Sequence, residues 1–521
     1  MRWHAHCVKE GRNGMGGMVW LVGAGPGDPG LFTLRGKEVL EQAEVVVYDA
    51  LVGPGVLSMI PETARLIYAG KRSGNHTLVQ EEINRILLEE AQKGYRVVRL
   101  KGGDPFLFGR GGEELELLRE HGIPFEVVPG VTSALAVPAY NGIPVTHRDF
   151  CSSVHIITGH RRSDNTDDLD FDALVRGGGT LVFLMGVRAL PDICTGLLEA
   201  GMPPDTPAAV LENGTTSRQR RVIATVSTLP EASARSSIQP PAVIVVGPVC
   251  ALAEQFSWYE KRPLAGIRVL VTRPKELISG LSSMLRRQGA EVLEYPAIST
   301  ELTEDRETLD AAIRKLEQGE FDWLVFTSPS GVRIFLEQLT ERCDLRALAG
   351  VRLAAIGRGS EKELRKYGLK ADYIPSVYDG RTLGAELAGL CRTGERILIP
   401  RAAAGNPELL DELSRGDHLM VTDLALYQTL HRAPRIMEET GFLQRENVDF
   451  AVFTSASTVR GFVESAHGID LTGVRAVCIG RQTQREAVRF GMRTWVAAEA
   501  TLESLVACVK QAASELGLCE H

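Results

Sequence analysis

The sequence predicts an α/β chain in two halves, each made of two lobes built on largely parallel sheets. Short apolar runs alternate with amphipathic helical stretches along the 521 residues. The alternation pauses near residue 258, at a charged segment that contains proline, and then restarts. The second half also contains an internal repeat. A chain of this length is too long for one compact core, so several domains are expected.

The strands are predicted from short apolar runs without polar alternation, which are typical of sheets covered on both faces. Four of these runs are VWLVGA (19–24), VVVYD (45–49), VVRLKG (97–102) and TLVFLMG (180–186). Between the second and third runs, residues 80–94 place Ile83, Leu87 and Ala91 on one face of an amphipathic helix. Strands that alternate with helices in this way indicate largely parallel sheets.

The clearest domain junction is the segment WYEKRPLAG (258–266). The first half ends on the apolar run 240–249, and a new strand begins in IRVLVTRP (267–274). A short charged segment with proline between two such strands is typical of a linker. We predict a leader at 1–17, a first half at 18–258, a linker at 259–266 and a second half at 267–515.

The repeat in the second half is visible by eye. FDWLVFTSPSGVRIFLEQL (321–339) is similar to VDFAVFTSASTVRGFVESA (448–466), and residues 350–374 are similar to residues 473–496. Each copy reads strand, Thr-Ser turn, helix, strand, Ile-Gly turn, helix, strand. Repeated units of this size predict two similar lobes whose loops line a cleft. We place lobe 1 at about 267–300 plus 430–515 and lobe 2 at about 301–429.

Composition and charge exclude several classes of function. A net charge of -8 argues against general affinity for nucleic acid or for anionic membranes. No stretch approaches the roughly 20 uninterrupted apolar residues of a membrane-spanning helix. The opening residues 1–17 lack the apolar core of a signal peptide, so we expect a disordered leader on a cytoplasmic protein.

The cysteines and histidines do not form a metal motif. The nine cysteines are scattered and contain no CxxC pair, which indicates reduced, mostly buried thiols. His155 and His160 are five positions apart, but no neighbouring residue completes a ligand set. We therefore predict no metal site.

The glycine-rich segment GAGPGDPG (23–30) follows a strand and precedes a helix predicted to open at Thr33. One interpretation is a nicotinamide-dinucleotide fingerprint. That fingerprint requires glycine at position 28, where this chain has Asp28, and Pro26 stiffens the loop. A turn with only a structural role is the other interpretation, and the loop alone does not separate the two.

Two further motifs are typical of a ligand site. RLKGGDPFLFGRGGEE (99–114) places two glycines and Asp104 at a strand end, where a carboxylate can meet a hydroxyl or a cation. PGVTSA (129–134) opens a helix, with Thr132 and Ser133 placed to cap it or to contact a substrate.

From about Val19 to Gly247, the chain resembles the uroporphyrinogen-III C-methyltransferases of the tetrapyrrole methylase family. The resemblance rests on several long motifs in the same order: VGAGPGDPGLFTL, VVYDALV, GKRSGNHTLVQEEIN, RLKGGDPFLFGRGGEE, PGVTSA, NGIPVTHR and ENGTTSRQR. It implies two α/β lobes with S-adenosylmethionine between them, and a homodimer. The family's cofactor contacts fall on Pro26, Gly102, Gly103, Asp104, Leu107, Thr132, Ser133, Met185 and Gly214.

The same resemblance implies a proton acceptor at Asp49 and a proton donor at Lys71. Methyl transfer from a sulfonium needs alignment, and the methylated macrocycle must then lose a proton. Other interpretations stay open for both residues. Asp49 at a strand end can be a turn or helix cap, while Lys71 with Arg72 can be a solvated pair or a contact for substrate carboxylates.

The second half offers hydroxyls instead of charged groups. They occupy matching places in the two repeats, at Thr327, Ser328 and Ser360 and then at Thr454, Ser455 and Thr483. Helix N-termini behind such hydroxyls bind anions through free backbone N–H groups. We predict that they bind a polycarboxylate substrate, although each hydroxyl alone is equally typical of a helix cap.

From about Gly266 onward, the chain resembles uroporphyrinogen-III synthase, with a flavodoxin-like parallel-sheet fold in two lobes. The resemblance rests on VLVTRP (269–274), GAEVLEYPAI (289–298), both FTS segments, IPRAAAGNPELLDEL (399–413) and VTDLALYQTL (421–430). It implies that hydroxymethylbilane loses water and closes to uroporphyrinogen III without a cofactor, with Tyr427 helping the hydroxyl to leave. The alternative for Tyr427 is a packing residue with a tethered hydroxyl.

Together the two resemblances imply a bifunctional enzyme whose product is precorrin-2, formed from uroporphyrinogen III by two methyl transfers. Two alternatives remain open on the sequence. One is a nicotinamide-dependent oxidoreductase, which Asp28 disfavours. The other is a methyltransferase whose C-terminal half is a non-catalytic module that delivers substrate.

Overall fold

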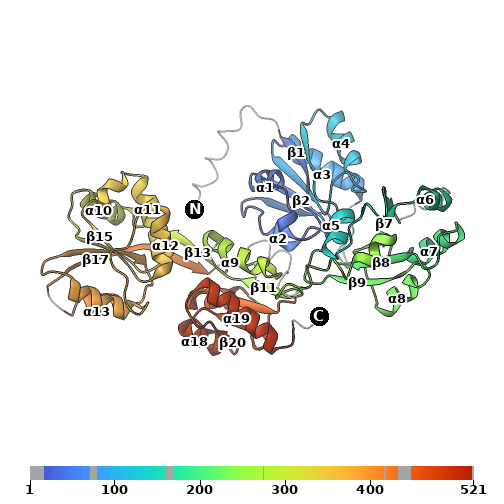
Figure 1. Ribbon diagram of the computed structural model, residues 1–521. Helices are drawn as coiled ribbons and strands as arrows, with labels where there is room; N and C mark the ends of the chain where they lie inside the picture. The colour runs from blue at the N-terminus through green and yellow to red at the C-terminus, as the bar shows by residue number, and fades with distance from the viewer. Residues whose placement is uncertain are drawn as a thin grey trace. The chain divides into compact units, whose positions relative to one another are not determined.

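The computed structural model describes residues 17–70, 79–159, 169–273, 275–415, 418–431, 447–466 and 468–518. These residues form four five-stranded sheets, each covered by helices (Figure 1). The chain divides into two compact units. The first contains residues 1–295, 433–459 and 466–521, and the second contains residues 296–432 and 460–465.

The first sheet is parallel throughout and has the order β3-β2-β4-β1-β5. Its strands are β1 (Met18–Gly23), β2 (Val45–Tyr48), β3 (Arg65–Tyr68), β4 (Arg96–Lys101) and β5 (Phe125–Val128). Helix α1 (Leu34–Glu41) packs on one face, while α3 (Gln80–Gln92) and α4 (Gly111–Glu120) pack on the other. The helix predicted from residues 80–94 is confirmed as α3, and Thr33 caps α1 as expected.

The second sheet has the order β6-β7-β10-β8-β9 and is mixed. Its strands are β6 (Val154–Thr158), β7 (Thr180–Leu184), β8 (Pro207–Glu212), β9 (Arg220–Thr225) and β10 (Ala242–Val246). Only β6 and β7 pair in parallel; the other three pairs are antiparallel. The prediction of parallel strands is therefore wrong for this sheet. Apolar side chains cover both faces of this sheet. The apolar runs in the sequence indicate that the strands are buried, but they do not indicate whether neighbouring strands are parallel or antiparallel.

The third sheet is parallel, with the order β12-β11-β18-β19-β20. Its strands are β11 (Arg268–Val271), β12 (Glu291–Glu294), β18 (Phe450–Phe453), β19 (Arg475–Cys478) and β20 (Arg493–Val496). The helices along this part of the chain are α9 (Lys275–Arg287), α17 (Ala456–Ser465), α18 (Arg481–Arg489) and α19 (Leu502–Glu515).

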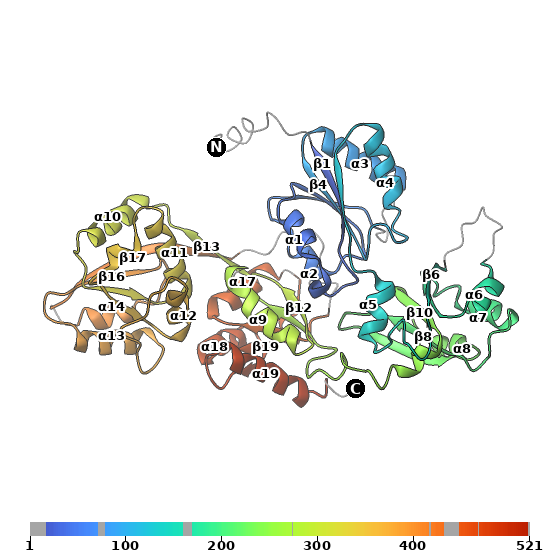
Figure 2. The same cartoon turned by 45° about the horizontal axis from the view of Figure 1, so that its top comes forward.

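The fourth sheet has the order β13-β17-β16-β14-β15, and only its edge strand β13 is antiparallel to its neighbour. The strands are β13 (Ile298–Leu302), β14 (Trp323–Phe326), β15 (Arg352–Ala355), β16 (Arg396–Ala402) and β17 (Met420–His431). Helices α10 (Arg306–Glu317) and α11 (Pro329–Thr340) cover one face, and α13 (Gly380–Leu390) and α14 (Glu408–Leu413) cover the other (Figure 2).

The repeat predicted from the sequence is confirmed in the two sheets of the second half. β14, α11, β15 and α12 (Arg358–Lys366) form one copy, and β18, α17, β19 and α18 form the other. The copies differ at the last strand, which is β20 in one copy and a single bridge between Ala354 and Tyr373 in the other.

The predicted linker is packed at several of its residues, although Lys261, Pro263 and Gly266 are exposed. Tyr259 is buried beside Tyr140, with ring centroids 5.0 Å apart, and Leu264 lies in the core beneath the third sheet. Arg262 lies over the ring of Trp258, 4.5 Å from its centroid. The domain limits proposed from the sequence stay a prediction, because one compact unit holds the first half together with the third sheet.

Candidate active sites

The glycine-rich loops of the first lobe meet at the carboxyl edge of the first sheet. The loop after β1 pairs with the loop after β4: the Gly103 N–H donates to the Gly25 carbonyl at 2.8 Å, and the Gly25 N–H donates to the Gly103 carbonyl at 3.2 Å. In a parallel α/β sheet this edge is where ligands bind. Pro26, Gly102 and Gly103 therefore lie close together at this edge.

Asp104 joins this pair of loops to the loop after β5. One carboxylate oxygen accepts from the N–H groups of Phe106 and Leu107, at 2.8 and 3.1 Å. The other accepts from the Gly130 N–H at 3.1 Å. The described contacts of the carboxylate are thus with backbone donors, whereas the sequence suggested a hydroxyl or a cation. A Cβ atom on Gly130 would lie 2.2 Å from the Gly103 carbonyl oxygen, so this approach requires glycine.

The second lobe contributes to the same place through α5 (Ser133–Tyr140). Thr132 caps this helix and accepts from the Ala134 N–H at 3.2 Å, as predicted, and Ser133 is its first residue. The apolar side of α5 packs against the second sheet. Because α5 begins at the edge of one sheet and lies on the other, the predicted site falls where the two lobes meet.

Two predicted contacts follow strands of the second sheet. Met185 comes directly after β7 and is 54% exposed in a left-handed conformation, with φ 57°. Gly214 follows β8, and a Cβ atom there would lie 2.4 Å from Val137 Cγ1 on α5. The neighbouring Thr215 accepts from the Asp28 N–H at 3.3 Å. The loops that carry Pro26 and Gly214 are therefore in contact.

The Asp28 carboxylate accepts hydrogen bonds from its own loop and from α5. It accepts from the Gly30 N–H at 2.7 Å and from the Tyr140 hydroxyl at 2.8 Å. Burial and the Asp28 carboxylate raise the pKa of Tyr140 well above its ordinary value. The residue that breaks the dinucleotide fingerprint thus fixes the loop after β1 against α5.

Asp49 follows the end of β2 at the same sheet edge. Its Oδ1 accepts from the Leu51 N–H at 3.0 Å, which is the turn-capping contact considered above. Its Oδ2 lies 3.7 Å from Nη2 of Arg99, so the same carboxylate also has a cationic neighbour. The predicted proton donor, Lys71, lies outside the described residues.

A buried cluster of charged side chains, formed by Arg99, Lys101 and Glu114, lies beside Asp49. The sequence pattern did not predict this cluster. Glu114 is fully buried on α4, and its Oε1 accepts from Arg99 Nε at 3.1 Å and from Lys101 Nζ at 2.7 Å. Burial lowers the pKa of Lys101, and the adjacent Arg99 charge lowers it further. Two cations at alternate positions of an apolar strand, followed by a glutamate in the next helix, are the signal that could have revealed the cluster.

Two of the predicted groups of the second half, Ser328 and Tyr427, are in direct polar contact. Their hydroxyl oxygens are 2.8 Å apart, and Ser328 also accepts from the Gly331 N–H at 2.9 Å at the start of α11. Tyr427 is buried on β17, and burial raises its pKa above the ordinary value for a tyrosine. A hydroxyl that is held in place and stays protonated can donate to a leaving group.

The other predicted hydroxyls differ in exposure. Thr327 and Thr454 end their strands and are half-buried, and Ser455 accepts from the Thr458 N–H at 3.2 Å while its Oγ lies 2.8 Å from Ser457 Oγ. Ser360 is 1% exposed, and its hydroxyl has no hydrogen-bond partner among the described residues; Thr483 is 4% exposed. Thr327, Ser328 and Ser360 belong to one compact unit; Thr454, Ser455 and Thr483 belong to the other.

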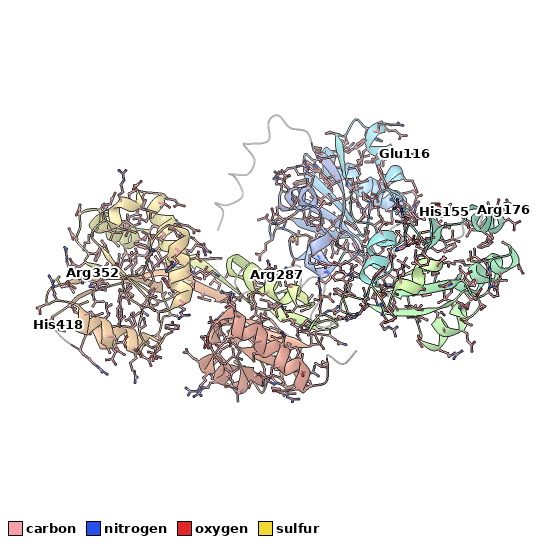
Figure 3. All side chains as sticks on the ribbon, viewed as in Figure 1. Glu116, His155, Arg176, Arg287, Arg352 and His418 are labelled. Atoms are coloured by element: carbon pink, nitrogen blue, oxygen red, sulfur yellow. The ribbon has the colours of Figure 1, made fainter. Side chains whose placement is uncertain are left out.

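Within the described ranges, His, Cys, Asp and Glu side chains form no cluster of three that could hold a metal. His155, on β6 of the second lobe (Figure 3), has Ser153 as a neighbour, with its Nε2 3.5 Å from the serine hydroxyl. His160 lies outside the described residues. Over the same part of the chain, no helix has the length and apolar character needed to span a membrane.

Comparison with known proteins assigns both halves. The sequence profile of the tetrapyrrole (corrin/porphyrin) methylases matches residues 18–230, and that of uroporphyrinogen-III synthase HemD matches residues 279–507. The chain is 45% identical to the porphyrin biosynthesis protein HemD of Ruminiclostridium josui over 491 residues, which are 94% of this chain and 97% of that protein. The chain belongs to this family of tetrapyrrole biosynthesis proteins.

Further relatives match the methylase half. The uroporphyrinogen-III C-methyltransferase of Bacillus subtilis is 42% identical over 354 residues, covering 68% of this chain and 72% of that protein. The crystal structure of the uroporphyrin-III C-methyl transferase of Thermus thermophilus, complexed with S-adenyl homocysteine, is 42% identical. It covers 45% of this chain and 99% of its own, with a TM-score of 0.40. The loops around Asp49 thus lie in a tetrapyrrole methylase domain, and Ser328 and Tyr427 lie in a uroporphyrinogen-III synthase domain.

Proposed function

We propose that the protein is a bifunctional enzyme that closes hydroxymethylbilane to uroporphyrinogen III and then methylates this product at C2 and C7 to give precorrin-2. The observation that carries the proposal is the presence in one chain of two domains whose families share uroporphyrinogen III. The methylase domain adds a carboxylate at the edge of its sheet, and the synthase domain adds a paired tyrosine and serine.

The methylase domain fits S-adenosylmethionine through its loops. The pairing of Gly25 with Gly103 and the exposed Met185 leave backbone and thioether groups at the place where the lobes meet. We assign the cofactor to Pro26, Gly102, Gly103, Asp104, Leu107, Thr132, Ser133, Met185 and Gly214. When bound, S-adenosylmethionine supplies the methyl groups as a sulfonium.

We assign to Asp49 the removal of the proton that the macrocycle must lose after each methylation. Addition of a methyl group to a pyrrole carbon leaves the ring system with a positive charge, which is removed when a proton departs. A carboxylate with one oxygen capped by Leu51 N–H and the other facing Arg99 is held in place and kept available to accept that proton. Lys71 is assigned the complementary donor role by resemblance alone.

The synthase domain is assigned the loss of water from hydroxymethylbilane. The terminal C–O bond breaks, and the hydroxyl departs as water after gaining a proton. The resulting carbocation forms a new C–C bond, ring D inverts, and loss of a proton from the attacked pyrrole carbon completes the closed macrocycle. Hydroxide is a poor leaving group, so a donor at that oxygen lowers the barrier. Tyr427, with Ser328 hydrogen-bonded to it, is the donor pair, and the Thr327, Thr454 and Ser455 hydroxyls are assigned to the substrate's carboxylates.

Ser360 and Thr483 are buried, but burial alone does not separate them from Tyr427, since the three residues are 1%, 4% and 5% exposed. We therefore assign Ser360 and Thr483 to the substrate as well, as the hydroxyls that follow the Ile-Gly turns of the two repeats.

The two activities are tested on the purified full chain in separate reactions. Hydroxymethylbilane alone should give uroporphyrinogen III in preference to the uncatalysed isomer I. Uroporphyrinogen III with labelled S-adenosylmethionine should take up two methyl groups per molecule. Formation of isomer I alone, with methylation intact, would instead make the C-terminal half a substrate-delivery module. Retention of NAD in place of S-adenosylmethionine would overturn the methylase assignment.

The assembly and the location of the enzyme are also part of the proposal. We expect a homodimer formed through the methylase domain, working in the cytoplasm. Light scattering of the purified chain would give twice the mass of one chain, and a monomer would remove this part of the proposal.

A further inference from the structure

The buried cluster behind Asp49 is unusual because its side chains are charged in an otherwise apolar layer. Val97 precedes Arg99 and Lys101 on the same face of β4, and that face is covered by α3 and α4. The side chains of Arg99 and Glu114 are only 5% and 0% exposed. Removing such charges from water is costly, and apolar residues of similar size are often equally stabilising. A role in stability alone therefore does not explain the cluster.

The register of the sheet brings the cluster to Asp49. β2 and β4 are parallel neighbours, with Val47 paired to Arg99 and Tyr48 paired to Leu100. Successive side chains of a strand alternate between faces, so the residue two positions after Val47 returns to the face that carries Arg99. That residue is Asp49, and the 3.7 Å separation between its Oδ2 and Arg99 Nη2 agrees with this placement.

Arg99 is held so that one end of its guanidinium reaches Asp49. Its Nε donates to Glu114 at 3.1 Å, and its Nη1 donates to the carbonyls of Leu100 and Val47 at 3.2 and 3.4 Å. Only Nη2 is left to face Asp49. A planar guanidinium that is fixed at Nε and Nη1 has a fixed direction for Nη2, so Glu114 sets the position of the charge beside Asp49.

We propose that Arg99 and Glu114 are positioning residues for proton removal by Asp49: Glu114 orients Arg99, and Arg99 fixes the direction of the Asp49 carboxylate. The inference rests on the proposed role of Asp49. Neither positioning residue accepts the substrate's proton. Their effect is on the direction of one carboxylate oxygen.

Few other charged groups act on Asp49 within the described residues. Lys101, also on β4, interacts with it electrostatically, and Glu114 from α4 balances both cations. From β3, Tyr68 packs edge-on against Tyr48, with ring centroids 5.3 Å apart. Arg99 is therefore the cation in direct contact, and its removal has the clearest expected effect.

The test is the rate of methyl transfer in the full chain, with kcat read separately from KM. Arg99→Gln removes the guanidinium that fixes the Asp49 carboxylate, so kcat should fall roughly ten- to hundredfold while KM for uroporphyrinogen III stays near that of the wild type. Arg99→Lys keeps a positive charge but loses the fixed fork, so it should not restore the wild-type kcat.

Glu114→Gln separates orientation from charge. The substitution leaves Arg99 charged but no longer held by a carboxylate, so kcat for methyl transfer should fall roughly ten- to hundredfold. Cofactor affinity, measured by calorimetry with S-adenosylhomocysteine, should stay near that of the wild type, because neither residue belongs to the cofactor loops. A loss of cofactor binding equal to the loss of rate would make the cluster structural and overturn the inference.

The chain provides a matched control in Glu90. Glu90 is also a buried glutamate of the first lobe with two cationic partners, Arg65 and Lys93, the latter at 2.9 Å. Arg65 pairs with Val45 at the opposite end of the strands, about 13 Å along the sheet from Asp49. Glu90→Gln should lower the melting temperature as Glu114→Gln does and leave kcat for methyl transfer unchanged.

The failure of this inference is distinguishable from failure of the proposed function. If Asp49→Asn methylates uroporphyrinogen III at the wild-type rate, Asp49 is not the acceptor and the proposed role falls. If Asp49→Asn is inactive while Arg99→Gln and Arg99→Lys have the wild-type kcat, the positioning role falls alone. Should Arg99→Gln not fold, an unchanged kcat in Arg99→Lys would still overturn the proposal.

Discussion

The two enzyme domains use similar architecture but different chemical groups. The methylase domain places a carboxylate, two cations and a buried glutamate around the end of β2 and β4. The synthase domain places neutral hydroxyls at the ends of its strands, with Ser328 and Tyr427 in direct contact. Both sets lie at the carboxyl edges of α/β sheets, where loops from several strands meet.

The difference follows the reactions that we propose. Loss of a proton from a methylated ring requires a base that is ionised at the working pH. Loss of water requires a donor that is still protonated at that pH. A carboxylate beside a guanidinium serves the first need, and a buried phenol serves the second. Substitutions in each domain should therefore affect one activity and leave the other intact.

The largest expected effect is that of Asp49→Asn. General acid–base groups contribute roughly 10²–10⁴-fold, so methyl transfer should fall by a factor in that range. The amide keeps the size of the side chain, and its oxygen can still accept from the Leu51 N–H. Rates measured with labelled S-adenosylmethionine and uroporphyrinogen III check this.

Two controls accompany the Asp49 measurement. Synthase turnover in the same variant should match that of the wild type, and so should cofactor affinity. A parallel loss of cofactor binding would show that Asp49 is a structural cap and would remove the contrast between the two domains on this point.

The next effect is that of Tyr427→Phe on the synthase domain. The ring keeps its packing on β17, while the hydroxyl that contacts Ser328 is lost. A single hydrogen bond is worth about 1 kcal/mol, so synthase turnover should fall by roughly five- to tenfold. Ser328→Ala removes the partner and should produce a smaller decrease. Turnover equal to wild type in Tyr427→Phe would make this tyrosine a packing residue and shift attention to Ser455.

The contrast also predicts different pH dependence. Burial raises the pKa of Tyr427 above the ordinary value of about 10, so its proton is retained further into the alkaline range. Synthase activity should therefore show no alkaline loss from this group below about pH 10. Methyl transfer does not use Tyr427, so Tyr427→Phe should leave its pH dependence unchanged. An alkaline limb near neutral pH in the synthase reaction, absent from Tyr427→Phe, would contradict this assignment.

The smallest effect is expected from cutting the chain between Pro263 and Leu264. Tyr259 and Arg262 pack on the methylase side of this bond, while Leu264 belongs to the core under the third sheet. Each fragment thus keeps the buried residues of its own half, and each should fold and retain its activity. Circular dichroism and the two assays check this. If both fragments unfold, the halves share a core and the comparison between independent domains fails.

Much of the fold could be predicted from the sequence because burial and repetition leave clear patterns. Apolar runs marked the strands, residues 80–94 marked α3, and the doubled FTS segments marked the two copies of the repeat. The direction of the strands in the second sheet could not be predicted in the same way. A strand that is buried on both faces has the same composition whether its neighbour is parallel or antiparallel.

The sites were predictable to a different degree. Motifs that stay close in sequence, such as the glycine-rich loops, marked Gly103 and Asp104, and the fold brings both to the same sheet edge. The contact between Ser328 and Tyr427 joins residues 99 positions apart, so only the fold reveals it. The cluster of Arg99 and Glu114 was missed for a related reason: an apolar strand with two cations gives no indication of which helix covers that face.

The central claim is that one chain performs consecutive steps with these two domains. Its most direct test is a single incubation of the purified wild-type protein with hydroxymethylbilane and S-adenosylmethionine, followed by mass spectrometry of the tetrapyrroles. The account predicts a dimethylated product with the mass of precorrin-2, and accumulation of unmethylated uroporphyrinogen III when Asp49→Asn replaces the wild type. Uroporphyrinogen I as the sole tetrapyrrole, with no methylated species from the wild-type protein, would contradict it.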